Sequence, residues 1–206
     1  MRSVFNVPAG FLDGGEIVDL MGDGTATQVI WHEAGHAVMA ELLRPGSVAL
    51  TSARSRSNTN GVNGFTISDL RDHDSVWGTY AHIFVDLAAR AAVEMKCGCV
   101  DTGSSQDLGN AFARMGRIQS NDASHGLFLH SVTRYGGSSD VLDREREIAA
   151  CTELESCYHK VKAILRRNDE FLVALASALA EKKALTAPEI AEVRNGCKIV
   201  EPGLLF

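Results

Sequence analysis

Residues 25–43 read TATQVIWHEAGHAVMAELL, and this stretch decides how the rest of the chain is interpreted. Apolar residues recur along it every three or four positions, which is typical of a helix with one face in a protein core. These residues are Ile30, Ala34, Val38 and Leu42. The helix is expected to end before Pro45, because proline has no amide hydrogen and disfavours helix in the residue before it.

The same helix carries the H-E-x-x-H pattern His32-Glu33-Ala34-Gly35-His36. Residues four apart lie one above the other on a helix, so both imidazoles can bind one metal ion. Two histidines and one further ligand leave the fourth position of a tetrahedral zinc site open to water. Glu33, about 100° around the helix from His32, can accept a proton from that water. The pattern predicts a zinc site with His32 and His36 as ligands and Glu33 as the general base.

The motif alone does not fix the third metal ligand. The extended pattern H-E-x-x-H-x-x-G-x-x-H fails, since Met39 and Leu42 stand where it requires glycine and histidine. Spacing does not choose among the candidates further along the chain. The candidates are Glu94, Asp101 and Asp107, followed by His73, His82, His125 and His130. Cys97-Gly98-Cys99 is a weaker metal-binding signal, because one close pair without a second departs from the usual zinc spacings.

Composition excludes several classes of protein. The 206 residues are 45% hydrophobic and 22% charged, which is the balance of an ordinary globular domain. Lys and Arg number 20 against 26 Asp and Glu, so the net charge is −6 and no nucleic-acid partner is expected. No apolar run approaches the length of a membrane span. Five cysteines, without a signal peptide before them, indicate reduced thiols in a cytoplasmic protein.

The remaining pattern predicts a mainly α protein (α+β) with one small β-sheet. Residues 1–24 are expected to form an N-terminal arm and residues 25–206 one domain. Two short strands are predicted at Ser47–Arg54 and Val62–Ser68, joined by a polar connection. Further helices are predicted at Asp74–Met95, at Ser104–Ile118, at Ser138–Arg166, after Asn168, and from Ala187 to about Arg194.

Two of these helices carry specific local expectations. The last one should begin with a capping box, with Thr186 as N-cap and Glu189 three residues later. The helix at 138–166 has an apolar stripe that is expected to face the core. The stripe comprises Ile148, Cys151, Leu154, Cys157, Tyr158, Val161 and Leu165.

Several blocks of the sequence resemble FtsH-type ATP-dependent zinc metalloproteases. His32 to Val38 (HEAGHAV) looks like the start of that family's peptidase domain. Leu87 to Glu94 (LAARAAVE) is similar to the family's LAGRAAEE, and Thr102 to Leu108 (TGSSQDL) is similar to its TGASNDL. The closing helices follow the family's order, so the resemblance runs from about Gln28 to Val193.

The resemblance implies that Asp107, the aspartate of the TGSSQDL block, completes the zinc site. It implies an FtsH peptidase-like helical domain with the small β-sheet beside the metal site. It also implies a zinc-dependent endopeptidase that hydrolyses peptides or unfolded protein segments. The chain has no G-x-x-x-x-G-K-[ST] phosphate-binding motif, so its activity is expected to be independent of ATP. A homo-oligomer is compatible with the family, although the family's ring depends partly on its ATPase.

The chain departs from the family at Val93, where the family has the first of two adjacent glutamates. If that glutamate supports a metal-binding histidine, its loss alters metal affinity and rate by about 10–100-fold. The departure favours an alternative function, a non-catalytic or weakly active zinc-binding module that acts as partner of a separately encoded ATPase.

Overall fold

The computed structural model describes residues 24–53, 64–70, 75–100, 103–119 and 140–203. Nearly all of the arm predicted at residues 1–24 therefore lies outside the described residues. The helices are α1 (Gly24–Leu43), α2 (Val76–Cys97), α3 (Ser105–Arg117), α4 (Asp140–Arg167), α5 (Asp169–Lys182) and α6 (Ala187–Asn195). The strands are β1 (Val48–Ser52), β2 (Phe65–Ser68) and β3 (Ala184–Thr186). The prediction of a mainly α protein with one small sheet is confirmed.

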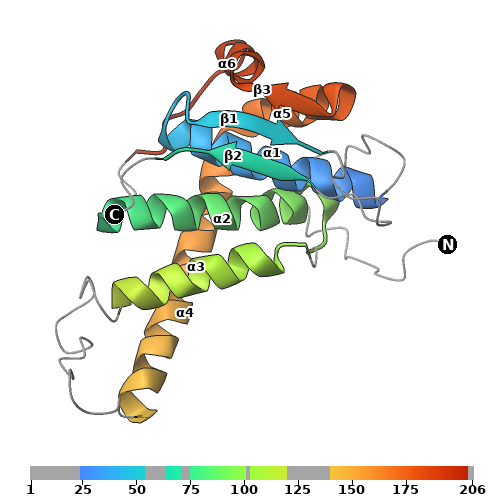
Figure 1. Ribbon diagram of the computed structural model, residues 1–206. Helices are drawn as coiled ribbons and strands as arrows, with labels where there is room; N and C mark the ends of the chain where they lie inside the picture. The colour runs from blue at the N-terminus through green and yellow to red at the C-terminus, as the bar shows by residue number, and fades with distance from the viewer. Residues whose placement is uncertain (1–23, 54–63, 71–74, 101–102, 120–139, 204–206) are drawn as a thin grey trace.

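Helix α1 occupies the centre of the structure. It packs against α2 on one side, against the sheet on another and against α5 on a third, while α4 crosses behind α2 and α3 (Figure 1). Between Ile30 and Leu42 every residue is buried except His32 and His36, which keep partial exposure. Periodicity predicted a helix with one buried face, but α1 is buried on almost all sides. Its two histidines lie on the part of the surface that remains exposed.

Gly35, inside the H-E-x-x-H motif, lets α1 and α2 approach closely. A Cβ atom at this position would lie 2.5 Å from the backbone oxygen of Ala88 and 2.9 Å from the Cβ atom of Ala92. Since real Cβ atoms do not come so close to other atoms, only glycine fits this helix crossing without a shift. The motif therefore fixes the packing of α2 as well as the positions of the two histidines.

A buried carboxylate organises the turn between α1 and the sheet. Glu41, in the last turn of α1, is 2% exposed and accepts hydrogen bonds from the amides of Gly46 and Val48 at 2.8 and 2.9 Å. Gly46 has a φ of +77°, a conformation that glycine adopts at little cost. These contacts lead the chain back along α1 and place β1 and β2 beside it.

The sheet has the strand order β2-β1-β3, and both pairs are antiparallel. The two predicted strands are present in shorter form, and β3 was not predicted. Its three residues, between α5 and α6, are too few to show an alternating pattern, and their pairing with β1 is a long-range contact. Because β3 covers one edge of β1, β2 forms the opposite edge of the sheet.

The capping box predicted for α6 is confirmed, whereas the apolar stripe predicted for α4 is buried only in part. Thr186 and Glu189 form the predicted capping box at the start of α6. In α4, Cys157, Val161 and Leu165 are fully buried, as the stripe predicted. Ile148 is 56% exposed and Cys151 is exposed as well. The first turns of α4 extend beyond α3 (Figure 1), so among the described residues nothing covers that part of the stripe.

Candidate metal centre

Three predicted ligands come together where α3 passes α1. His32 and His36 stand one turn apart on α1, and Asp107 lies in the first turn of α3. Asp107 Oδ2 is 3.2 Å from His32 Nε2 and 3.5 Å from His36 Nε2. Candidate donor atoms of the three side chains all lie within 4.8 Å of one another. Among the described residues, no other group of three histidine, cysteine or acidic side chains has this property.

The spacing and chemistry of these donors fit a zinc ion. Donors held at about 2.0–2.2 Å by one tetrahedral zinc lie about 3.3–3.6 Å apart. The two nitrogen–oxygen distances given above are of that size. Two imidazoles and one carboxylate make three protein ligands, the number found in zinc sites that keep a fourth position for water or substrate.

The histidines and the helix terminus favour the ionised form of Asp107. Burial alone would raise its pKa, but hydrogen bonds from His32 and His36, with their charges, bring the pKa well below the ordinary value. The carboxylate also lies in the first turn of α3, where the helix dipole favours a negative charge. A metal ligand needs a deprotonated carboxylate, so this environment suits that role.

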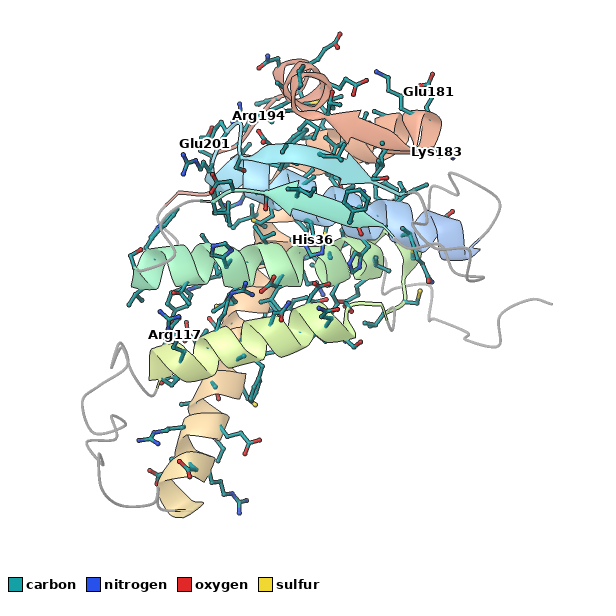
Figure 2. All side chains as sticks on the ribbon, viewed as in Figure 1. His36, Arg117, Glu181, Lys183, Arg194 and Glu201 are labelled. Carbon is teal, nitrogen blue, oxygen red and sulfur yellow. The ribbon has the colours of Figure 1, made fainter. Side chains whose placement is uncertain are left out.

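His36 is oriented by a backbone group. Its Nδ1 lies 2.8 Å from the carbonyl oxygen of Val85 on α2, and it points from α1 toward that helix (Figure 2). With Nδ1 donating its proton to this carbonyl, removal of the Nε2 proton that bonds Asp107 would give Nε2 a lone pair for a metal. Val93, by contrast, is fully buried in the core, and Glu94 accepts a hydrogen bond from Tyr158.

Glu33 is the most enclosed carboxylate at this centre. The residue is 4% exposed, and its Oε2 accepts a hydrogen bond from Thr66 Oγ1 at 2.7 Å. Burial raises the pKa of Glu33 above its ordinary value, an effect that the charge of His36 and the Thr66 hydrogen bond offset only in part. A glutamate is a better general acid and base when its pKa is raised toward the working pH, and the shift of Glu33 is in that direction.

A cleft of about 530 Å³ opens over these side chains. Its walls come from α1, β2, α2 and the start of α3, so the small sheet does lie beside the candidate metal site. The edge strand contributes Phe65, Thr66 and Ser68, and Gly64 precedes it. The helices contribute His82, Val85, Asp86, Gln106 and Asn110 among others.

The other candidate ligands lie elsewhere. Glu94 pairs with Lys162 at 2.9 Å, on the face of α2 that meets α4. His82 lines the cleft but is not part of the three-residue group. Cys97 and Cys99 belong to no such group among the described residues. Asp101, His73, His125 and His130 lie outside the described residues.

Sequence reasoning missed an ion pair beside the centre. Asp86 of α2, which lines the cleft, is paired with Arg114 of α3. Burial raises the pKa of Asp86 to about 6, although the neighbouring guanidinium acts in the opposite direction. His82 and Asp86 are four residues apart and so share one helix face, which is the one local signal the sequence offered for this wall. Thr66 was also missed, because its partner Glu33 is remote in sequence.

The fold and the site together define a metallopeptidase domain: a buried H-E-x-x-H helix, a carboxylate from a second helix, and an edge strand along the cleft. The chain belongs to peptidase family M41, whose sequence profile matches residues 20–193. The resemblance to FtsH-type proteases is thereby confirmed at the level of the family, and Zn²⁺ is the metal of this family.

Individual relatives are distant but cover most of this chain. ATP-dependent zinc metalloprotease FtsH 1 of Sorangium cellulosum is 31% identical over 182 residues, covering 81% of this chain and 29% of that protein. FtsH of Thermus thermophilus is 30% identical over 184 residues, covering 84% and 29%. FtsH of Lachnoclostridium phytofermentans is 27% identical over 167 residues, covering 78% and 28%. The chain thus spans less than a third of the length of these relatives. Within its described residues, no helix is both long and apolar enough to cross a bilayer.

Proposed function

We propose that this chain is a zinc-dependent endopeptidase that cleaves peptides or unfolded protein segments without a requirement for ATP. In this proposal His32, His36 and Asp107 hold one Zn²⁺, and Glu33 is the general base. The observation that carries it is the convergence of the three donors beside Glu33, at the floor of a cleft lined by an edge strand.

Each residue of the proposed site has a separate role in hydrolysis. A zinc ion bound by these three side chains would lower the pKa of water and polarise the scissile carbonyl group. Glu33 accepts the proton of the attacking water and then passes it to the leaving amine, as a carboxyl group with a raised pKa can do. The Val85 carbonyl keeps His36 in the tautomer with Nε2 facing the donor cluster.

The edge strand supports binding of an extended substrate. Strand β2 pairs with β1 on one side, and no other described strand pairs with it. A peptide can add to such an edge through backbone hydrogen bonds. These bonds require an extended conformation and depend little on the amino-acid sequence of the peptide. Folded proteins cannot offer such a strand without local unfolding. Short peptides and unfolded segments are therefore the proposed substrates.

The alternative is a zinc-binding module with little or no activity that serves a separately encoded ATPase. Its sequence argument is the loss of a glutamate at position 93, where the chain has a fully buried valine. Association with an ATPase and assembly into a homo-oligomer remain predictions, as does the cytoplasmic location drawn from cysteine usage.

Zinc analysis and peptide cleavage on the same preparation test the proposal. The protein with one equivalent of zinc should cleave an unstructured fluorogenic peptide without nucleotide. Activity should disappear with a chelator and return when zinc is restored, because the apoprotein lacks the Lewis acid. If zinc binds at one equivalent and no unstructured substrate is cleaved, the non-catalytic module is the better interpretation.

A further inference from the structure

The Glu33 side chain is held at two points, by Thr66 of β2 and by Gly64, the residue before this strand. Thr66 Oγ1 donates a hydrogen bond to Glu33 Oε2 at 2.7 Å. At Gly64 a Cβ atom would lie 2.4 Å from Glu33 Cγ and 2.5 Å from Oε1. One carboxylate oxygen is therefore tied by a hydroxyl, and the other lies against a backbone position that has room for hydrogen only.

The hydroxyl that binds Glu33 is itself fixed by a neighbour. Thr66 Oγ1 lies 2.8 Å from Thr51 Oγ1, and the two residues face each other across β1 and β2. Thr66 Oγ1 has one proton, and both of its acceptors belong to Glu33: the carboxylate Oε2 at 2.7 Å and the backbone oxygen at 3.3 Å. Thr51, which is fully buried, then donates to Thr66. The donors run in one direction, from the middle strand through the edge strand to the carboxylate.

We propose that Gly64 and Thr66 are positioning residues for Glu33. The segment proposed to bind the peptide thus also orients the general base. This inference rests on the proposed function, in which Glu33 takes a proton from water. A glutamate side chain has three rotatable bonds, and two contacts to one segment remove most of that freedom. Displacement of a reacting group by about 1 Å costs up to about 10²-fold in rate.

Two substitutions distinguish the effect of the Thr66 hydroxyl from the effect of its side-chain volume. Thr66→Val keeps a branched side chain of similar volume and lacks the donor, whereas Thr66→Ser keeps the donor and lacks the methyl group. Thr66→Val should lower kcat by about ten- to a hundredfold with KM within about twofold, because β2 still offers its backbone to peptide. Thr66→Ser should recover most of kcat. Zinc stoichiometry should stay at one in both variants, since neither changes a ligand.

Gly64→Ala provides a second test, which acts through steric contact with Glu33 and not through a hydrogen bond. The added methyl group would occupy the place of the Glu33 carboxylate, so either the carboxylate or the strand must move. Loss of kcat with retained zinc is the expected result. A Gly64→Ala protein with wild-type kcat would overturn the steric part of the inference.

Crystal structures of the zinc-free Thr66→Val and Thr66→Ser proteins give a readout that does not depend on turnover. The Glu33 carboxylate should leave its place beside β2 in the valine variant and keep it in the serine variant. An unmoved carboxylate in Thr66→Val, or a kcat equal to wild type, would overturn the inference. If wild type itself cleaves nothing, the proposed function fails, and these structures still decide whether Thr66 positions Glu33.

Discussion

Replacing Gly35 with alanine tests the packing that places His32 and His36, the proposed zinc ligands. In an ordinary helix this change is stabilising by about 1 kcal/mol, because alanine has the higher helix propensity. Here the new methyl group would meet a backbone oxygen of α2 at 2.5 Å, almost an ångström inside ordinary contact. That oxygen belongs to Ala88, in the middle of a helix, and cannot rotate away. The two helices must therefore separate or bend.

The expected magnitude follows from these opposing effects. Overpacking of a core costs about 1–3 kcal/mol, and contact with helix backbone places Gly35→Ala at the upper end of that range. After the gain in propensity, the free energy of unfolding of the metal-free protein should fall by about 2 kcal/mol. The His36–Val85 hydrogen bond crosses the same helix pair, so zinc affinity should fall as well.

Urea denaturation followed by circular dichroism measures this change, with Gly109→Ala as the matched control. Gly109 lies in α3, and a methyl group added there would have no neighbouring atom within 4 Å, so the same substitution should stabilise by about 0.5–1 kcal/mol. The two variants should thus differ in sign. A Gly35→Ala protein at least as stable as wild type would refute the reasoning about this helix crossing.

Three further outcomes are expected. Asp107→Ala should weaken zinc binding, measured by competition with a chelator, by more than the 10–100-fold typical of losing a residue that only supports a ligand. Asn168 is 1% exposed and exchanges hydrogen bonds with both backbone groups of Val200, so Asn168→Ala should cost about 2–3 kcal/mol in urea unfolding. The Lys182 ammonium and Thr186 lower the pKa of Glu189 to about 2. Its contribution to stability is complete above its ordinary pKa of 4.5 and is lost as pH falls toward 2. The unfolding temperature of Glu189→Gln should therefore fall less than that of wild type between pH 4.5 and about 2. An equal fall in both proteins would contradict this account of the helix cap.

Local spacing in the sequence was enough to predict the elements that depend on local structure. The histidines four apart, the stop after α1 and the capping box of α6 are all set by residues within one or two turns. Residue spacing also predicted the small sheet, whereas its place beside the metal site came from the family resemblance. Asp107 needed the family resemblance, because periodicity could not choose among acidic candidates on different helices.

Contacts between remote segments could not be read from the sequence. The partner of His36 is a backbone carbonyl, and every residue has one, so Val85 carried no signal. Thr66 reaches Glu33 only because the turn after α1 brings β2 back along the helix. The burial of α1 on almost all sides has the same origin, since the sheet and α5 cover faces that periodicity left open.

Cleavage of an unstructured peptide by zinc-loaded wild type and by Glu33→Gln is the most direct test of the central claim. The substitution preserves size and polarity and removes the base, because an amide cannot accept the proton. Both proteins should bind one equivalent of zinc, and kcat of Glu33→Gln should be lower by about 10²–10⁴-fold. A Glu33→Gln protein that retains zinc and cleaves the peptide at the wild-type rate would contradict the account.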